Sequence, residues 1–273
     1  MPRANGVGRL VLDSFGEETR INELFQRAPI RIMFPKFGTT TAPEEAVLIN
    51  TAGGIAGGDR LDYAITALAN ASIAVTSQAA EKVHRSLDEP SRIKTRLGVF
   101  GAARLAWLPQ ETIVFNRAFI SRQTEIEISS KAQLLALEWL VLGRAAHGEE
   151  FVDGYIGDSW RVKRDGRLIW ADTFRANKQA ISQFHRTALL FDFRAIGTLI
   201  YFGPEAAARL AMLREIAPQL GCQCAVTAVA GLIIARFAAR VSADMRRAVR
   251  GVLEQFKEQS GSGPFRIPKM WSC

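Results

Sequence analysis

Apolar residues recur at every second position in several separate segments, and this spacing constrains the fold more than any other feature of the chain. In the segment 60–76 the apolar residues of one parity are Leu61, Tyr63, Ile65, Ala67, Ile73 and Val75. The segments 91–99 and 124–129 alternate in the same way. A period of two is typical of strands with one buried face, whereas helices have a period of about 3.6. The first two thirds of the chain therefore predict β-structure.

The segment 160–170, WRVKRDGRLIW, predicts a β-hairpin. Asp165 and Gly166 fit the two positive-φ positions of a type I′ turn. Apolar and aromatic residues stand at every second position on both sides of this turn, as paired strands require.

The last third of the chain has a different pattern. Pro204 opens a predicted helix over 205–216, because the first turn of a helix tolerates a residue without an N–H group. Ser242 is a suitable N-cap for a second helix over 243–259, whose apolar residues recur at helical spacing. The Gly-Ser-Gly-Pro sequence at 261–264 would end this helix.

Short strands are expected around these two helices. The segment 198–202 predicts one strand, and 225–237 predicts two that are broken at Gly231. The C-terminal tail, RIPKMWSC, is expected to run extended. The chain as a whole, residues 1–273, then forms one mainly β domain with two α-helices near its C-terminus.

The composition excludes several classes of protein. Apolar residues make up 48% of the chain and charged residues 23%, which excludes wholesale disorder. Three cysteines do not form the framework of a secreted disulfide scaffold, and the N-terminus lacks the apolar stretch of a signal peptide. The uncharged segment 216–235 is interrupted by Pro, Gln and Gly and is too polar for a membrane span. We expect a cytoplasmic protein with no membrane association.

The formal net charge of +8 indicates an acidic partner, which could be nucleic acid or the surface of another protein. The basic residues are scattered, and no aromatic residues are interleaved with them as in a groove for single strands. A solvated surface with excess Lys and Arg explains the same charge.

A glycine-rich segment, GGIAGGD at residues 53–59, is the most prominent local motif. Such a loop can expose backbone N–H groups to a phosphate. It lacks the Lys-Ser or Lys-Thr of a P-loop, and it leads into a strand pattern instead of the helix of a dinucleotide site. The alternative is a tight turn or bulge that needs glycine for its backbone conformation.

Residues that typically bind metals are few. Cys222 and Cys224 would point to one face of a strand. They are either two ligands for a soft metal ion or simply two buried thiols. His84, His147 and His185 belong to no zinc-type spacing, and no Ser or Cys lies in a motif typical of a nucleophile.

Three carboxylates lie in unusual surroundings. Glu138 stands in LLALEWLVLG, Asp172 in LIWADTF, and Asp59 closes the glycine-rich segment. A carboxylate among apolar residues must be paired, hydrogen-bonded, protonated or in contact with water. They could form internal salt bridges, with Arg144 and Arg175 as candidate partners, or they could line a wet internal cavity that handles a cation.

Four motifs, in order along the chain, resemble those of the UreD (also UreH) urease accessory protein family. They are LINTAGGIAGGDRLDYAI, TSQAAEKVHRS, LAWLPQETIVFNRA and LEWLVLGRAAHGEEF. The N-terminal TRINELFQRAPIRIMFP and the terminal RIPKMWSC fit the same pattern. Small departures occur at Glu81, His84 and Lys269. The residues of this chain that match the family motifs are Gly53, Gly54, Gly57, Gly58, Asp59, Lys82, Arg85, Pro109, Gln110, Glu111, Gly143, Arg144, Gly148 and Glu149.

The resemblance implies a fold and a function. The fold would be a flattened, β-helix-like stack of strands with two helices. The function would be that of a scaffold without enzymatic activity, which acts with UreF and the GTPase UreG to insert nickel into apo-urease. Nickel would be transient cargo in an internal tunnel, with no tightly bound cofactor.

The resemblance also gives the candidate residues a setting. Asp59, Glu138 and Asp172 would face the tunnel, because a conduit needs ligands that bind nickel weakly. Arg266, Pro268 and Trp271 in the tail would either dock a partner or seal the core. Two other functions remain open: a sugar-phosphate or nucleotide enzyme that uses the glycine-rich segment, and a basic module that binds nucleic acid.

Overall fold

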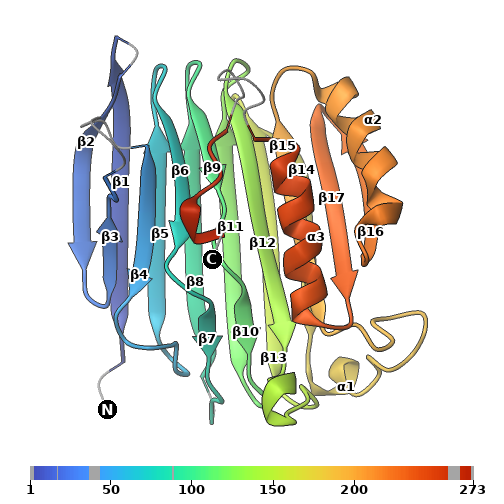
Figure 1. The fold of residues 1–273 in the computed structure, drawn as a ribbon. Coiled ribbons are helices and arrows are strands. Elements are labelled where there is room, and N and C mark those ends of the chain that lie inside the picture. The colour runs from blue at the N-terminus through green and yellow to red at the C-terminus, as the bar shows by residue number, and fades with distance from the viewer. Residues whose placement is uncertain (1–2, 17, 37–43, 88, 258–264, 272–273) are drawn as a thin grey trace.

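The computed structural model describes residues 3–16, 18–36, 44–87, 89–257 and 265–271. Within these residues the chain forms two β-sheets that face each other (Figure 1). The first sheet has seven strands in the order β14-β13-β11-β8-β5-β1-β2. Its strands are β1 (Asn5–Phe15), β2 (Glu18–Arg27), β5 (Arg60–Ala67), β8 (Ser91–Val99), β11 (Phe119–Ile128), β13 (Tyr155–Arg164) and β14 (Arg167–Ala176).

The second sheet has ten strands, eight of them in the order β16-β17-β15-β12-β9-β6-β4-β3. These eight are β3 (Ile30–Met33), β4 (Glu45–Asn50), β6 (Ser72–Ser77), β9 (Arg104–Trp107), β12 (Gln133–Leu142), β15 (Ala195–Phe202), β16 (Gln223–Val229) and β17 (Leu232–Ala239). The short strands β7 (Glu81–Val83) and β10 (Thr112–Val114) pair with each other, and β10 also pairs with β12.

Successive long strands alternate between the two sheets. From β4 to β13, and apart from the short strands, the chain passes back and forth between the sheets. Each of these strands is parallel to its neighbour in the same sheet. This path is a flattened β-solenoid and confirms the expected fold class. Only the two ends of each sheet contain antiparallel pairs, such as β13 with β14.

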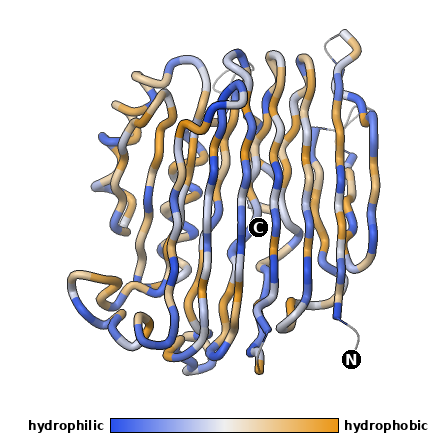
Figure 2. Tube along the Cα trace, turned by 180° about the vertical axis from the view of Figure 1, so that it is seen from behind, coloured by the Kyte–Doolittle hydropathy of each residue, from blue (hydrophilic) through white to orange (hydrophobic). Residues whose placement is uncertain are grey.

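The predicted hairpin is confirmed and is longer than expected, because it comprises all of β13 and β14. Asp165 and Gly166 have φ angles of +50° and +78°, as a type I′ turn requires. The predicted break at Gly231 is also confirmed, since Ala230 and Gly231 have positive φ between β16 and β17. Figure 2 shows hydrophobic and hydrophilic residues alternating along the strands of the seven-stranded sheet.

The two predicted helices pack on the outer face of the second sheet (Figure 1). They are α2 (Ala206–Ile216) and α3 (Ser242–Glu254), and α3 buries Met245, Val249 and Val252. The prediction that Ser242 is an N-cap is wrong: the capping position is Val241, and no side chain caps the helix. Residues 258–264, which include the predicted end of this helix, lie outside the described residues.

Short helical segments complete the structure and were not expected from the sequence. They are α1 (Lys178–Ile181), η1 (Ala145–His147), η2 (Ala217–Gln219) and η3 (Lys269–Trp271). The tail is therefore not fully extended, because its last described residues form the 3₁₀ turn η3. No helix in the described parts of the chain combines the length and the apolar character that a membrane crossing needs.

Apolar residues form two layers of core. One layer fills the space between the sheets, and the other lies between the second sheet, its helices and the tail. Strand β12 contributes to both layers, which explains its nearly continuous apolar sequence. Its even-numbered residues face the other sheet, so Glu138 is a carboxylate placed in the core between Ala136 and Leu140.

Candidate functional site

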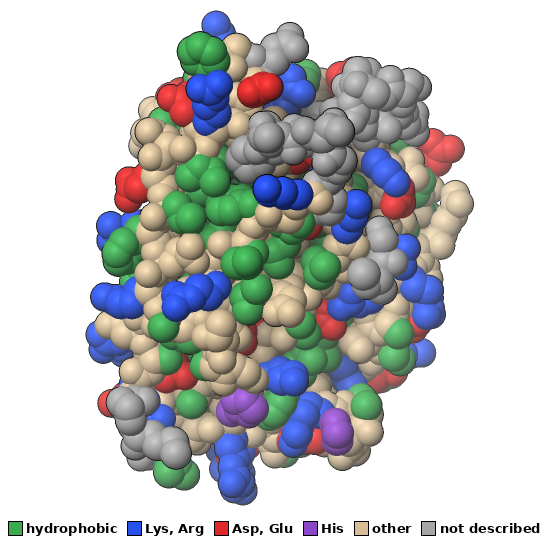
Figure 3. Space-filling view, turned by 60° about the vertical axis from the view of Figure 1, so that its left-hand side comes forward, with side chains coloured by type: hydrophobic (Ala, Val, Ile, Leu, Met, Phe, Trp, Pro, Cys, Tyr) green, Lys and Arg blue, Asp and Glu red, His purple; other side chains and the backbone are tan. Residues whose placement is uncertain are grey.

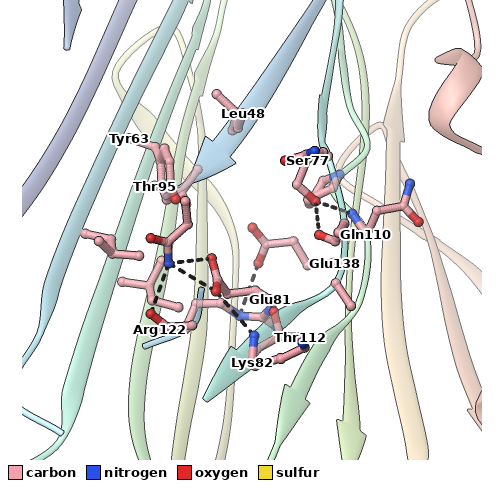
Figure 4. Close-up of a pocket in the computed structure, with 18 of the residues that line it drawn as sticks. Leu48, Tyr63, Ser77, Glu81, Lys82, Thr95, Gln110, Thr112, Arg122 and Glu138 are labelled. Atoms are coloured by element: carbon pink, nitrogen blue, oxygen red, sulfur yellow. Dashed lines mark hydrogen bonds and ion pairs between the residues drawn. The ribbon is translucent and has the colours of Figure 1, made fainter. Parts of the chain in front are cut away.

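A cavity of about 280 Å³ lies between the two sheets, around Glu138. The first sheet contributes Tyr63 and Arg122 to its wall, the second contributes Glu81 and Glu138, and the loop after β9 contributes Gln110 (Figure 4). A polar lining is unusual for the core of a solenoid, because a buried polar group must be paired or hydrated. We call this space the inner cavity.

Glu138 and Arg122 form the centre of the polar lining. Nε of Arg122 lies 3.3 Å from Oε2 of Glu138, and both side chains are almost fully buried. Glu138 also accepts hydrogen bonds from Nε1 of Trp107 and from Oγ1 of Thr124, each of 3.0 Å. Both carboxylate oxygens of Glu138 therefore have donors from the protein.

Asp158 completes this cluster from the neighbouring strand. Asp158 on β13 is the register partner of Arg122 on β11. Nε and Nη2 of Arg122 donate to its two carboxylate oxygens at 2.9 and 2.6 Å, which is the bidentate geometry of a strong ion pair. One buried guanidinium is thus shared between two carboxylates, and we call Arg122, Glu138 and Asp158 the central cluster.

Burial and charge act in opposite directions on this cluster. Burial raises the pKa of Glu138, while the Arg122 guanidinium and the two donated hydrogen bonds lower it; the net direction is upward. Burial alone would lower the pKa of Arg122, but the two carboxylates outweigh it and raise this pKa above its ordinary value. Arg122 therefore stays charged, and the cluster is neutral or negative according to the proton on Glu138.

Glu81 is a second acidic group in the wall of the inner cavity. Nδ2 of Asn50 donates to its carboxylate oxygens at 3.1 Å. Burial raises the pKa of Glu81, and the bond from Asn50 opposes this effect. Burial likewise raises the pKa of the Tyr63 hydroxyl, so this phenol stays protonated.

A second cavity, of about 210 Å³, also adjoins the central cluster. Arg122 and Glu138 line both cavities, and Asp158 and Asp172 line the second. Asp172 on β14 pairs across the sheets with Arg236 on β17, at 2.9 Å between Nη2 and Oδ2. The structure therefore brings Glu138 and Asp172, two of the three predicted carboxylates, to one cavity.

An open cleft of about 770 Å³ adjoins the inner cavity at one end of the strands. The two share Gly53 and Lys82 in their walls. His84, Arg144 and His147 also line the cleft. Figure 3 shows histidine side chains among Lys and Arg at the lower end of the molecule. The hollows form a series: each shares lining residues with the next.

Asp59 has a different role in the structure. It lines neither the inner nor the second cavity, and its two oxygens accept the N–H groups of Ala4 and Ala56, each at 2.8 Å. The glycine-rich segment packs tightly against the residues after β7. A Cβ on Gly57 would lie 1.9 Å from Oγ of Ser86, and one on Gly54 would lie 2.4 Å from Nε2 of His84. The geometry supports the interpretation of this segment as a structural turn that Asp59 closes.

The salt-bridge partners expected for the buried carboxylates are wrong. Arg144 pairs with Glu149 instead, at 2.6 Å, because it lies beyond the end of β12 beside η1. Glu138 pairs with Arg122, and Asp172 pairs with Arg236. A sequence signal could have found Arg122: the alternation of 124–129 extends back to Ile120 and places Arg122 on the same buried face.

The remaining motif residues make structural contacts. Gly143 and Gly148 have positive φ on either side of η1, and the Arg144–Glu149 pair spans this turn. Gln110 and Glu111, after Pro109, bind the guanidinium of Arg246 on α3 at 2.8 and 2.5 Å. Lys82 is the exposed middle residue of β7, and the exposed Arg85 lies two residues beyond the end of this strand.

The C-terminal tail packs into the chain. Trp271 is 1% exposed, and its Nε1 donates to the carbonyl of Leu108 at 2.8 Å. Pro268 is buried as well, while Arg266 is exposed and pairs with Glu44 at 2.7 Å. Of the three tail residues predicted to dock a partner or seal the core, two therefore seal the core.

The cysteines and histidines do not gather. In the described ranges, no group of three or more His, Cys, Asp or Glu side chains is arranged to hold a metal ion. Cys222 and Cys224 are half-buried against the outer core layer, and burial raises the pKa of Cys224 to about 11. Both thiols therefore stay protonated and are poor metal ligands in this state.

Comparison with known proteins gives a consistent result. The sequence model of the family described as UreD urease accessory protein matches residues 4–272. The urease accessory protein UreD of Rhizobium leguminosarum bv. viciae is 36% identical over 270 residues, which cover 99% of this chain and 96% of the relative. UreD of Xanthobacter autotrophicus is 37% identical over 270 residues, covering 99% and 90%. UreD of a Methylobacterium species is 37% identical over 277 residues, covering 98% and 95%.

Proposed function

Because this chain belongs to the UreD family of urease accessory proteins, with a role in urease maturation, we propose that it is a scaffold that conducts nickel to apo-urease. In this proposal it acts without catalysis, together with UreF and the GTPase UreG, in the cytoplasm. Nickel is cargo and not a resident cofactor.

One observation carries the proposal: two cavities between the sheets meet at the central cluster. Both are lined by carboxylates and by Arg122, in a region that an ordinary solenoid would fill with apolar side chains. The open cleft extends this series to the end of the strands. A cation could pass from one hollow to the next along the residues that they share.

The chemistry of the lining suits a conduit. Nickel binds more tightly to imidazole and thiolate ligands than to carboxylate and water, so carboxylates release it more readily. Glu138 and Asp172 offer carboxylates in the second cavity, and Glu81 offers one in the inner cavity. We assign Glu138 and Asp172 to the path. Asp59 holds the glycine-rich turn, so its replacement would affect nickel transfer through folding.

The test is nickel content in urease matured with variants of this chain. Glu138→Gln keeps the shape of the side chain and one of its two acceptor oxygens but removes the charge. Co-expression with the urease operon should give urease with less nickel, while pull-down of UreF and UreG stays unchanged. Glu23→Gln is the control, because Glu23 is exposed on β2. Full nickel loading with the Glu138 and Asp172 variants would contradict the proposal.

A further inference from the structure

The side chain of Arg122 lines both the inner cavity and the second cavity, at the place where the two share residues. It is 6% exposed and projects from β11 into the space between the sheets. A bulky, permanently charged group at this junction is unexpected in a passage for cations. The physical question is what the guanidinium does there.

The contacts of Arg122 are those of a bound cation. Its guanidinium touches two carboxylates, Asp158 at 2.9 and 2.6 Å and Glu138 at 3.3 Å. Two carboxylates around one small region are also what a divalent cation with oxygen ligands requires. The guanidinium therefore occupies a position that suits an exchangeable metal ion.

The carboxylate of Glu138 does not depend on Arg122 for its orientation. Trp107 and Thr124 each donate to it at 3.0 Å, and neither bond involves the guanidinium. If the guanidinium moves toward either cavity, the carboxylate keeps its place and two donors. The Glu138 carboxylate of the site is then already in place when Arg122 leaves it.

We propose that Arg122 is an internal counter-cation that occupies a divalent-cation site formed by Glu138 and Asp158, and that a passing metal ion must displace it. This inference rests on the proposed function for the identity of the metal as cargo. The arrangement would keep the site weak. It would offset one carboxylate charge when no metal is present, and it would prevent the junction from retaining nickel.

The first test measures nickel binding to the purified full chain by isothermal titration calorimetry, with Ni²⁺ alone as the probe. Arg122→Met has a similar length without the charge. The site formed by Glu138 and Asp158 should bind one nickel ion in this variant. Its affinity for Ni²⁺ should be at least about tenfold higher than in the unchanged protein, because the competing charge is gone. The double variant Arg122→Met with Glu138→Gln should lose this gain.

The control is Arg96→Met. Arg96 forms an ion pair with Asp62 at 2.5 Å on the half-exposed outer face of the first sheet. It pairs with a single carboxylate and lines none of the cavities described above, so its removal should leave nickel binding unchanged. Equal nickel affinity in Arg122→Met and the unchanged chain would overturn the inference, as would an equal gain in Arg96→Met.

Loss of folding would not hide the result. Arg122→Lys keeps the charge but loses the bidentate fork, and it should bind nickel no more tightly than the unchanged chain. Nickel should also raise the melting temperature of Arg122→Met more than that of Arg122→Lys, since a ligand that binds the folded state stabilises it. An equal rise in both variants would count against the inference.

These outcomes are distinct from those that test the proposed function. The inference is decided by the nickel affinity of the isolated chain, whereas the proposed function is decided by the nickel content of urease. An Arg122→Met chain that binds nickel tightly should also deliver less of it. If Glu138→Gln leaves the nickel content of urease unchanged while Arg122→Met still binds nickel more tightly, the proposed conduit is contradicted and the proposed cation site is supported.

Discussion

Arg122 and Glu138 lie on strands of opposite sheets, and their side chains meet at 3.3 Å in the middle of the core. The contact joins β11 to β12, which are consecutive strands separated by one passage of the solenoid. It is therefore both an inter-sheet tie and the junction of two cavities. Because this contact both ties the two sheets together and lines both cavities, it leads to separate predictions for stability and for metal transfer.

Removing one member of the pair should strongly destabilise the fold. Glu138→Ala leaves the Arg122 charge with Asp158 as its remaining carboxylate and leaves Trp107 and Thr124 without their acceptor. Each buried donor that is left without an acceptor costs about 1–3 kcal/mol, and the loss of the contact with Arg122 adds to this. Urea unfolding of the two proteins measures the difference.

The matched control for this stability test is a surface pair. Glu125→Ala breaks the contact of Glu125 with Lys94, whose side chains are more than a third exposed. Such pairs contribute about 0–1 kcal/mol. A similar loss in Glu125→Ala and Glu138→Ala would show that burial of the central cluster does not determine its effect.

The raised pKa of Glu81 predicts a pH-dependent stability. The folded state binds a proton on this carboxyl more tightly than the unfolded state does, so low pH favours the folded state over the unfolded state. This advantage is complete below the unfolded pKa, about 4.3, and is lost as the pH rises through the higher folded pKa.

Glu81→Gln should remove this dependence on pH, because the amide is neutral throughout and can still accept from Asn50. The variant should equal the unchanged protein near pH 4 and exceed it in free energy of unfolding at pH 8. Chemical denaturation at several pH values measures the gap, with the exposed Glu23→Gln as control. A constant gap across this range would contradict the assignment.

Local patterns in the sequence predicted the strands well. The alternation of β5, β8 and β11 and the Asp-Gly turn of the β13–β14 hairpin depend on neighbours in the chain, which the sequence displays directly. The helix over 243–259 followed from helical spacing for the same reason, and the helix over 205–216 followed from the position of Pro204. The stacked, β-helix-like arrangement of the strands was predicted only from the family resemblance, because the sequence of a turn does not reveal which sheet the next strand joins.

The site was less predictable than the fold. Glu138 and Asp172 were identified as carboxylates in apolar segments, but their partners Arg122 and Arg236 lie across the core. Sequence proximity favoured Arg144 and Arg175, which lie near them in the chain. Partners across two sheets depend on the register of the whole solenoid, and a single strand does not contain this information.

The glycine-rich segment predicts a graded response to alanine. Gly57→Ala would place a Cβ 1.9 Å from Oγ of Ser86 and 2.8 Å from the carbonyl oxygen of Glu89, so the backbone must shift. At Gly53 the space is open, and the cost is that of a positive φ, about 1 kcal/mol. Thermal unfolding should show a larger loss for Gly57→Ala. Equal losses would mean that backbone conformation alone requires the glycines.

The packing of Trp271 separates a folding role from a docking role for the tail. Trp271→Ala removes a buried side chain and its bond to Leu108, which costs about 3–5 kcal/mol. Arg266→Ala removes an exposed partner of Glu44 and should cost no more than about 1 kcal/mol. Urea unfolding of the isolated chain, followed by pull-down of UreF under conditions where each variant is folded, measures both roles. If the tail acts through folding, folded Trp271→Ala retains UreF although it unfolds more easily. A variant that is as stable as the unchanged chain but no longer retains UreF would show instead that the tail contacts the partner directly.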